Sequence, residues 1–390
     1  MKSVDAPACV MMVAGEASGD QHGAKVVAAM RRMNPELFFC GIGGGSMKAA
    51  GVRILVDARE LSVVGITEVI GKLPTVFRAL ATVKKLIQSL RPDLVILIDF
   101  PDFNFRVAAA AKKAGVPVLY YISPQIWAWR PGRVKKIARL VDHMAVILPF
   151  EAEFYQRHGI PVTFVGHPLL DGLQATSPEA PKMNARQPSV VGLLPGSRQV
   201  EISRLLPVML AAAQRMRQDN PMLEFVVSVA PTVDRSWLET AVARSGCGTA
   251  VRLTDDPVED IFRQCRMVIA ASGTVTLQAA LHGTPMIIIY RVSPSSYWLG
   301  RLLIRVKFIG LINLIADRPL VPELVQDDAS PENIARCAAE MLGDEGRLNR
   351  MRRELLAAHE ALGGPGASQR VADIALEMLH DRFTAVKKNP

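Results

Sequence analysis

Short apolar runs alternate with helix-length segments along most of the chain, and this alternation limits the fold most. Each run is rich in β-branched residues and is followed by a loop of Gly, Ser, Pro or Asp. Strands that are almost continuously apolar and alternate with helices are typical of parallel sheets covered on both faces. The runs occupy residues 9–13, 37–40, 94–98, 116–122, 144–148 and 162–165 in the first half, and 190–194, 223–229, 267–270 and 286–290 in the second. We therefore predict an α/β protein with two Rossmann-like, doubly wound units.

The 390 residues are far more than one hydrophobic core needs, and composition places a boundary between the two units. Residues 171–188 contain three prolines and little apolar content, as a linker does. The sequence thus predicts a first domain at 1–170 and a second at 189–365. Beyond residue 330 the pattern is helical, with a glycine-rich break at 363–366. We expect the last segment, about 366–390, to pack back on the first domain of its own chain or on that of another subunit. The second arrangement would make the protein a homo-oligomer.

The chain has 46 Lys and Arg against 37 Asp and Glu, a net charge of +9. This excess favours an anionic partner: nucleic acid, an anionic membrane surface or a phosphorylated substrate. The five cysteines are scattered without a CxxC pair, so we expect neither disulfides nor zinc, and a reducing, cytoplasmic compartment. Residues 267–290 lack Asp, Glu, Lys and Arg, but glycine-containing breaks favour strand, helix and strand over a membrane span.

In open parallel sheets, ligands bind where the carboxyl ends of strands meet loops and helix N-termini, so these loops are the candidate sites. The first such loop is Gly-rich and carries Glu16, Ser18 and Asp20. Because two carboxylates would repel phosphate, this loop is better suited to sugar hydroxyls. The alternative is a plain turn in which Ser18 or Asp20 caps the next helix.

The second loop reads GIGGGS at 41–46 and differs from a dinucleotide-binding fingerprint, because Ser46 stands where that fingerprint has its last Gly or Ala. Asp57 follows on what reads as a short strand, so an NAD site stays open. The other interpretation is a tight turn in which Gly43 and Gly44 pack close to substrate.

Asp99 ends the apolar run 94–98, at the position from which a side chain faces a ligand. A carboxylate at the end of a hydrophobic strand is costly unless it has a partner or a chemical task. We therefore predict that Asp99 is a general base. Asp102 and Asn104 begin the next helix, where capping is the simpler interpretation.

Residues 123–130 read SPQIWAWR and hold Gln125 and two of the four tryptophans of the chain, Trp127 and Trp129. Five cations lie within residues 130–139. Such a cluster is typical of a nucleic-acid or anionic-surface patch, and a solvated helix face is the plainer alternative. Two tryptophans in one strand-end loop favour the wall of a binding site.

Two loops of the second half favour phosphate. Ser197 and Arg198 lie between a strand and a helix, where an Arg and backbone N–H groups suit a diphosphate leaving group. Ser272, Gly273 and Thr274 also open a helix, and their small side chains let a phosphate reach its N-terminus. The two loops together predict a site that binds a nucleotide diphosphate and uses neither a Walker lysine nor a metal cluster.

The segment 63–90 is apolar but carries four cations, among them Lys72. One interpretation is a helix of the core. The other is a helix that binds an anionic leaflet through apolar burial and nearby positive charge. In that case the membrane contacts are the apolar and basic residues of its first half: Val64, Ile66, Val69, Ile70, Lys72 and Leu73.

Eight motifs, in this order, closely resemble those of lipid-A-disaccharide synthases. They are GEASGD (15–20), GIGG (41–44), SVVGITEV (62–69), DFPDFNF (99–105), SPQIWAWR (123–130), FVGHP (164–168), LPGSR with Glu201 (194–201) and SGTVTLQ (272–278). The resemblance continues through Asn313 and residues 317–324, and so spans nearly the whole chain.

The resemblance implies an inverting, metal-independent glycosyltransferase of the GT-B fold that needs no cofactor. Such an enzyme moves 2,3-diacylglucosamine from UDP to the 6-hydroxyl of 2,3-diacylglucosamine 1-phosphate, forming the β-1,6-linked lipid A disaccharide 1-phosphate and UDP. Its partners would be lipid substrates and the cytoplasmic face of the inner membrane, to which it binds peripherally, and not nucleic acid.

The resemblance also implies a division of the site residues. Donor binding falls to Ser197, Arg198, Glu201, Ser272, Gly273, Thr274, Gln278 and Asn313, and acceptor or sugar binding to Glu16, Ser18, Asp20, Gly43, Gly44, Asn104, Gln125 and Trp127. One position departs from the family pattern, because Gln278 stands where Glu is common, near the expected ribose hydroxyls. Gln lacks the charge-assisted acceptor, so weaker donor binding is expected.

In the expected mechanism Asp99 takes the proton of the acceptor hydroxyl, and Arg198 with the helix start at 272–274 stabilises the departing UDP. Glu16 and Asp102 are the next candidates for the base. The alternatives are a UDP-sugar epimerase or hydrolase, another GT-B glycosyltransferase such as a peptidoglycan enzyme, and a membrane- or nucleic-acid-binding protein without activity.

Overall fold

The computed structural model describes residues 7–61, 66–172, 189–230, 233–294, 297, 300–301 and 306–388, without the side chains of 66–73, 131 and 385–388. By contacts the chain divides into two units: unit 1 is Met1–Leu173 with Leu362–Pro390, and unit 2 is Gln174–Ala361. The predicted linker 171–188 lies outside the described residues from 173 onward.

Unit 1 contains a seven-stranded parallel sheet in the order β3-β2-β1-β4-β5-β6-β7. Its strands are β1 (Cys9–Ala14), β2 (Phe38–Gly43), β3 (Arg53–Asp57), β4 (Leu94–Ile98), β5 (Val118–Tyr121), β6 (His143–Val146) and β7 (Val162–Phe164). Its helices are α1 (Ala17–Met33), α2 (Gly45–Ala49), α3 (Ala58–Leu61), α4 (Ile66–Leu90), α5 (Pro101–Lys113), α6 (Ile126–Trp129), α7 (Val134–Leu140), α8 (Pro149–Gln156) and α17 (Ala367–Lys388), with short 3-10 turns at Pro131–Arg133 and Pro168–Gly172.

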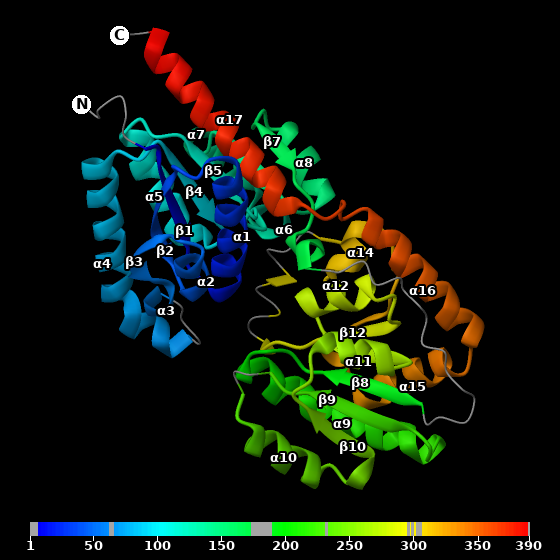
Figure 1. Ribbon diagram of the computed structural model, residues 1–390. Coiled ribbons are helices and arrows are strands. Elements are labelled where there is room, and N and C mark those ends of the chain that lie inside the picture. Colours follow the sequence, from blue (N-terminus) through cyan, green and yellow to red (C-terminus); the bar gives the residue numbers. More distant parts are fainter. Residues whose placement is uncertain are drawn as a thin grey trace. The chain divides into compact units, whose positions relative to one another are not determined.

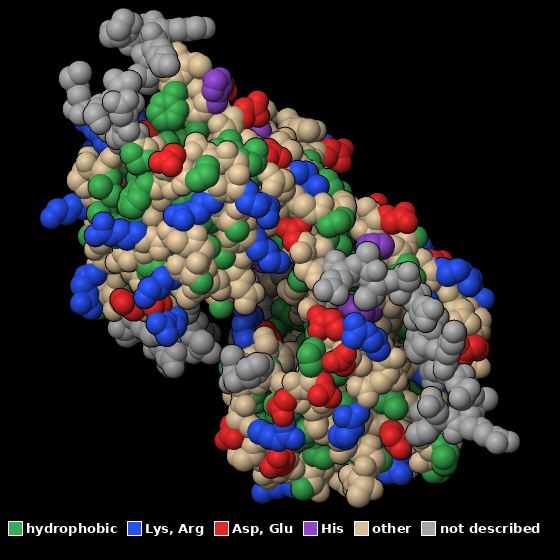
Figure 2. Space-filling view, viewed as in Figure 1, with side chains coloured by type: hydrophobic (Ala, Val, Ile, Leu, Met, Phe, Trp, Pro, Cys, Tyr) green, Lys and Arg blue, Asp and Glu red, His purple; other side chains and the backbone are tan. Residues whose placement is uncertain are grey.

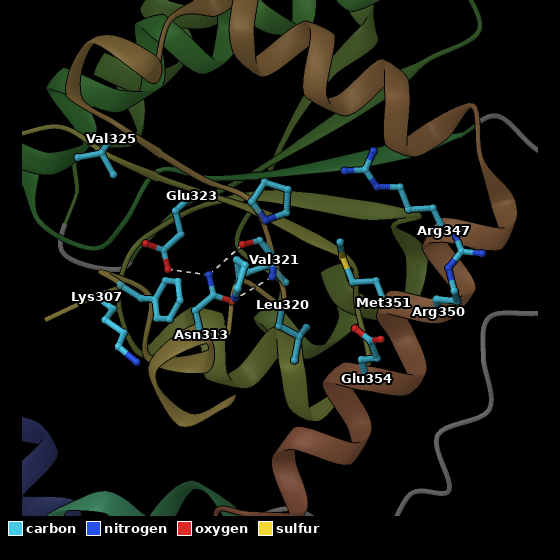
Figure 3. Close-up of a pocket in the computed structure, with 13 residues that line it drawn as sticks. Lys307, Asn313, Leu320, Val321, Glu323, Val325, Arg347, Arg350, Met351 and Glu354 are labelled. Carbon is cyan, nitrogen blue, oxygen red and sulfur yellow. Dashed lines mark hydrogen bonds between the residues drawn. The ribbon is translucent and has the colours of Figure 1, made fainter. Parts of the chain in front are cut away.

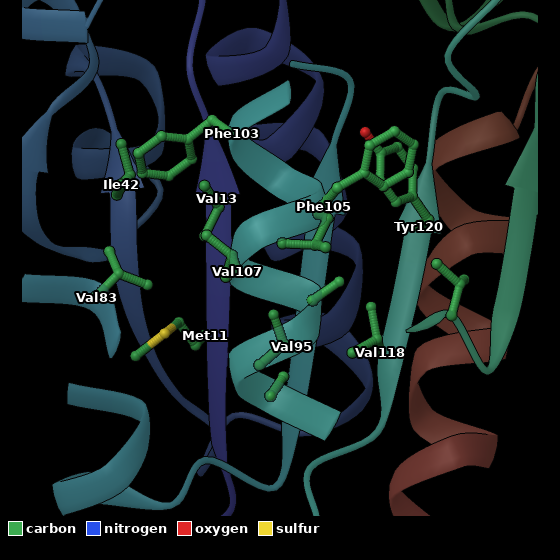
Figure 4. Packing of buried hydrophobic residues seen from close by; sticks show 14 of the residues in the cluster. Met11, Val13, Ile42, Val83, Val95, Phe103, Phe105, Val107, Val118 and Tyr120 are labelled. Atoms are coloured by element: carbon green, nitrogen blue, oxygen red, sulfur yellow. The ribbon is translucent and has the colours of Figure 1, made fainter. Parts of the chain in front are cut away.

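The sheet of unit 1 is covered on both faces, as the apolar strands predict. Successive strand residues point to opposite sides, so Met11 and Val13 of β1 join the core under α4 and α5, whereas Val10 and Met12 join the core under α1 and α17. Figure 4 shows the first of these cores, with side chains of β1, β4 and β5 packed against α5.

The C-terminal helix α17 packs on α1 of unit 1, as Figure 1 shows. Its first turn is held by Asp171, whose carboxylate accepts hydrogen bonds from the backbone N–H groups of Gly366, Ala367 and Ser368 at 2.7–2.9 Å. Although burial raises the pKa of Asp171, these bonds and that of the Ser368 hydroxyl hold it below its ordinary value. An acidic cap at a helix N-terminus therefore joins the end of the chain to the first unit.

Unit 2 contains a six-stranded parallel sheet in the order β10-β9-β8-β11-β12-β13. Its strands are β8 (Val190–Leu194), β9 (Glu224–Ser228), β10 (Val251–Thr254), β11 (Met267–Ala271), β12 (Met286–Tyr290) and β13 (Glu323–Val325). Its helices include α9 (Gln199–Asp219), α10 (Arg235–Arg244), α11 (Val258–Gln264), α12 (Thr274–Leu281), α14 (Leu311–Ala316), α15 (Pro331–Leu342) and α16 (Glu345–Glu360). Helix α9 packs on α15, and α12 packs on α16.

The uncharged segment 267–290 forms β11, α12 and β12, as predicted. Among the described residues, no helix is both long enough and apolar enough to cross a membrane.

Candidate active site

Asp99 follows β4 with unusual backbone geometry. Its φ is +46° and that of Phe100 is +49°, so two successive residues other than glycine adopt the left-handed conformation. Each costs about 1–3 kcal/mol and persists only when its surroundings fix it. Here the Asp99 carbonyl accepts hydrogen bonds from Tyr120 Oη and Asn104 Nδ2, both at 2.6 Å. Such strain is typical of functional sites.

The carboxyl group of Asp99 is partly buried, and its surroundings favour the neutral form. Burial and, after it, the Glu16 carboxylate raise its pKa, the backbone N–H of Phe100 lowers it, and the net result is a pKa of about 6. At neutral pH the group is therefore mostly ionised, yet basic enough to accept a proton efficiently. These are the properties that a general base requires.

The first loop lies against this strand end. A Cβ atom on Gly15 would meet the Phe100 ring at 2.3 Å, so only glycine fits there. The side chains of Glu16 and Ser18 are exposed. Glu16 is the residue before α1, and its side chain makes no capping hydrogen bond to that helix. Both remain candidates for contact with sugar hydroxyls.

Asp20, for which a sugar contact was predicted, is bonded to backbone in this structure. It is 6% exposed, and its carboxylate accepts hydrogen bonds from the N–H groups of Gly44, Ser46 and Met47 at 2.6, 2.9 and 3.1 Å. It thus fills the N-terminus of α2, where a dinucleotide would need to place its phosphates. A Cβ on Gly44 would meet Asp20 at 2.9 Å and one on Gly43 would meet Met47 at 2.7 Å, so packing explains both glycines.

Asn104 is also internal. It is fully buried, and its amide nitrogen donates to the carbonyls of Ile98 and Asp99. These bonds hold the end of β4, and sugar binding by Asn104 stays a prediction. Asp102, the alternative base, is exposed and pairs with Arg133 at 3.0 Å.

The loop after β5 contains Gln125, which is exposed, and Trp127, which is partly exposed. Trp127 Nε1 donates to Glu151 Oε1 at 3.0 Å. Glu151 is a buried residue that the sequence prediction missed. Its pKa is raised to about 7 because burial outweighs the hydrogen bonds from Trp127, Leu148 and Ile147, which lower it. A Glu near a helix start predicts only a cap, and nothing local in the sequence predicts its burial.

The predicted membrane contacts are described only in part. Val64 lies outside the described residues, and Ile66, Val69, Ile70, Lys72 and Leu73 are described only as backbone of α4. Further along α4, Leu80, Val83 and Ile87 are buried in the core, whereas Phe77 is 54% exposed. The second half of this helix is therefore part of the core.

Unit 2 contains a cavity of about 600 Å³ at the carboxyl ends of β8, β9 and β11. It brings together six of the eight predicted donor-binding residues: Ser197, Glu201, Ser272, Gly273, Thr274 and Gln278. The opposite wall includes Ser228 and the stretch 255–258, which the sequence prediction missed. Helices α9 and α12 both begin beside this cavity, so their positive ends favour an anion in it.

Arg198, immediately before α9, is available to such an anion. Its side chain is 73% exposed and pairs with Glu201 at 3.1 Å. An exposed ion pair contributes at most about 1 kcal/mol, so a phosphate can replace the carboxylate at little cost. Gly196 has φ +108°, and a Cβ there would meet Glu201 at 2.8 Å, so glycine lets the loop turn tightly at this point.

Gln278 lines the cavity and donates from Nε2 to Glu259 Oε1 at 3.3 Å. Glu259 belongs to α11 on the opposite wall. The bond orients the amide group, and it leaves the Gln278 oxygen as the acceptor for a ligand.

Asn313 does not line this cavity. It is fully buried and bonded to the backbone of Val321 and to Glu323, beside a second cavity of about 550 Å³ (Figure 3). Glu323 in turn accepts from the N–H groups of Ile309 and Gly310, and the Ser272 hydroxyl donates to the Ile309 carbonyl. Asn313 is therefore connected to Ser272 of the donor cavity by this chain of contacts, and donor binding by Asn313 itself stays a prediction.

Comparisons with known proteins agree with this architecture. The family model of the lipid-A-disaccharide synthetases matches residues 10–377. The chain is 49% identical to the lipid-A-disaccharide synthase of Geobacter metallireducens, over 95% of this chain and 97% of the relative. It is 47% identical to that of Trichlorobacter lovleyi, over 97% and 99% of the two chains.

Among solved structures, the UDP-GlcNAc 2-epimerase of Neisseria meningitidis bound to UDP-GlcNAc is similar, with a TM-score of 0.63, 12% identity and coverage of 95% and 100%. The calicheamicin glycosyltransferase CalG4 gives a TM-score of 0.60 at 14% identity, with coverage of 96% and 98%. At such identities these structures show the fold alone, which is GT-B. The chain belongs to the lipid-A-disaccharide synthase family, and it is a glycosyltransferase of lipid A biosynthesis.

Proposed function

We propose that this chain transfers 2,3-diacylglucosamine from UDP-2,3-diacylglucosamine to the 6-hydroxyl of 2,3-diacylglucosamine 1-phosphate, releasing UDP. The observation that carries the proposal is the cavity of unit 2, which collects two helix starts, three serines and the Gln278 amide at one edge of a parallel sheet. Helix starts attract the diphosphate, and the amide oxygen accepts a hydroxyl of the nucleotide sugar.

Asp99 is the proposed general base. Its carboxylate takes the proton of the acceptor hydroxyl while that oxygen attacks the anomeric carbon of the donor, and the bond from this carbon to the UDP oxygen breaks. Attack opposite the leaving group inverts the anomeric configuration and gives the β-1,6 linkage. Glu16 and Ser18, exposed on the neighbouring loop, are proposed to contact the acceptor sugar, with Gln125 and Trp127.

Arg198 and the start of α12 are proposed to stabilise UDP as negative charge develops on its leaving oxygen. The exposed guanidinium exchanges Glu201 for phosphate, and the N–H groups of the first helical turn point at the diphosphate. These groups supply the positive charge that a metal ion supplies in other transferases. We therefore expect neither a metal nor another cofactor to be required.

The partners in this proposal are lipids, and the protein acts while bound to the cytoplasmic face of the inner membrane. The net charge of +9 favours anionic lipid, and Lys and Arg side chains are spread over the face of unit 1 in the upper part of Figure 2. Phe77 exposes 54% of its surface on α4, the helix that also contains the predicted membrane contacts from Ile66 to Leu73. Polar replacement of Val64, Ile66, Val69 and Ile70 should move folded protein into the soluble fraction; misfolding would identify these residues as core.

The test is release of UDP from UDP-2,3-diacylglucosamine in detergent and EDTA, with and without 2,3-diacylglucosamine 1-phosphate. Release that depends on the acceptor and survives EDTA is expected. The structural similarity to UDP-sugar epimerases makes an epimerase or hydrolase the second candidate. Consumption of the donor without acceptor would favour it.

A further inference from the structure

Glu151 is a buried carboxyl group to which the proposed mechanism gives no task. It is 1% exposed, the lowest value among the described acidic residues that are buried, and it lies in the first turn of α8. Burying a carboxyl group is costly unless hydrogen bonds satisfy it, so its contacts show what it does.

The two oxygens of Glu151 serve different elements. Oε2 accepts from the N–H groups of Leu148 and Ile147 at 3.1 and 3.3 Å, an ordinary cap of the α8 start that needs no burial. Oε1 accepts from Trp127 Nε1 at 3.0 Å, on α6 after the neighbouring strand. Strands β5 and β6 are paired, so one carboxyl group connects the loops at two adjacent strand ends.

The indole of Trp127 is fixed on two sides. Its N–H is bound to Glu151, and the Phe150 ring meets it edge to face, with ring centres 4.8 Å apart and an interplanar angle of 82°. The beginning of the same loop is held to α8 by a 2.6 Å hydrogen bond between the hydroxyls of Ser123 and Tyr155. A four-residue helix such as α6 cannot by itself fix so large a side chain, so α8 holds this loop.

The loop also adjoins the strand end of the proposed base. Strand β5 pairs with β4 on one side and β6 on the other, and Tyr120 of β5 donates to the Asp99 carbonyl at 2.6 Å. Asp99, Trp127 and Glu151 thus each follow the carboxyl end of one of three adjacent strands. A partly exposed indole at this edge offers a flat apolar surface, which suits the C–H face of a pyranose ring.

We propose that Glu151 is a positioning residue that holds the Trp127 indole as a wall for the acceptor sugar ring. This rests on the proposed function, because it places Trp127 in the acceptor site. Glu151 does not touch the sugar; it sets the angle at which the indole meets it.

The test compares Glu151→Gln with Glu153→Gln, the same change two residues along α8 at an exposed side chain that pairs with Arg157. Glu151→Gln should raise the acceptor KM about tenfold, because a displaced contact weakens substrate positioning. The donor KM should change less than about twofold, and Glu153→Gln should leave both within about twofold. Equal rises in both KM values for Glu151→Gln would overturn the proposal.

Trp127→Phe tests the same contact from the other side and leaves the α8 cap intact. It keeps an aromatic ring but removes the N–H donor, so the acceptor KM should rise similarly. In this background, adding Glu151→Gln should raise the acceptor KM by less than about twofold, because the bond is already absent. A full rise in both backgrounds would show that Glu151 acts only as a helix cap.

A spectroscopic measurement separates this proposal from the proposed function. Four tryptophans give four indole N–H signals in ¹⁵N-labelled protein, and Trp127→Phe identifies the one of interest. Recorded at a pH above the Glu151 pKa of about 7, where the carboxyl group is ionised, that signal should move upfield in Glu151→Gln, since the charge-assisted bond is lost. An unchanged signal would contradict the contact itself. Absence of acceptor-dependent UDP release in the unaltered protein would instead contradict the function, whatever the spectrum shows.

Discussion

The six strands of unit 2 have the same order as the first six strands of unit 1, but the chemistry at equivalent strand ends is opposite. In each sheet the first strand lies beside the fourth, so β8 corresponds to β1 and β11 to β4. The loops after β1 and β4 carry Glu16 and Asp99, whereas those after β8 and β11 carry Arg198 and the small residues at 272–274. One architecture therefore provides acid groups in unit 1, which would repel phosphate, and a cavity in unit 2 that favours it.

The rigidity of the two strand ends also differs. Asp99 and Phe100 are held in left-handed geometry by a buried tyrosine and a buried asparagine, and the charge state of the carboxyl group is set by its burial. In unit 2, Arg198 is exposed and loosely paired. A base must be fixed against its substrate, whereas a group that binds a large anion can exchange one partner for another.

The largest effect is expected from Asp99→Asn, which keeps the shape of the side chain and removes the base. It should lower kcat by about 10²–10⁴-fold, the usual contribution of general base catalysis, in an acceptor-dependent UDP-release assay. Donor affinity and the unfolding midpoint should stay close to those of the parent. Asp102→Asn is the control, because it makes the same change at a nearby exposed carboxylate. If it lowered kcat as much as Asp99→Asn or more, the base would have to be reassigned.

A smaller effect is expected from Arg198→Ala, next to Ser197 of the donor cavity. Loss of one charge-assisted contact to the diphosphate should raise the donor KM and lower kcat, together by about 10–100-fold in kcat/KM, with little change in the acceptor KM. Arg204→Ala, an exposed cation further along α9, provides the control. Equal weakening of donor and acceptor would remove Arg198 from the donor site.

Gln278→Glu is expected to weaken UDP binding by a few-fold, although the resemblance of the motif implies Glu at this position. In this chain the new carboxylate would face Glu259, now 3.3 Å from the Gln278 amide, and like charges repel at that distance. In the double variant Gln278→Glu with Glu259→Gln the two side chains are exchanged and the repulsion is absent. Calorimetry should therefore show that UDP affinity returns toward that of the parent. Tighter binding by the single variant would support the simpler expectation that Gln weakens the donor site.

The smallest effect concerns pH. If Asp99 is the base, kcat/KM should rise with pH and level off above about 6, since the ionised form is active. The Glu16 carboxylate raises the pKa of Asp99, so Glu16→Gln should lower that pKa and move the acidic limb to lower pH by less than about one unit. A shift to higher pH would contradict this electrostatic coupling.

The strands of the sheet interiors and the donor loops could be predicted because their signals are local. Continuous apolar runs mark strands buried on both faces, and the rule that ligands bind at carboxyl ends then selects the loops at 197–198 and 272–274. Strands β10 and β13 were missed because they are short edge strands that contain charged residues, Arg252 and Glu323. Edge strands are half covered, so their apolar pattern is weak.

The polar residues near the sites were harder to assign. Asp20, Asn104 and Asn313 have the residue types of binding groups, yet each satisfies buried backbone atoms of its own unit. Glu151 was missed for the converse reason, since its local pattern predicts an exposed cap. A polar side chain beside a ligand and one that satisfies a buried N–H group look the same in sequence, because their partners are distant in the chain.

The sequence by itself determined the family, the two parallel sheets and the loops at which chemistry occurs, because hydrophobic periodicity and glycine-containing turns act over a few residues. Only the tertiary structure decided which carboxyl groups are buried, which are bonded to backbone, and which keep an oxygen for a substrate. Those properties depend on partners such as Trp127 for Glu151 and Met47 for Asp20, which folding brings together from 24 and 27 residues away.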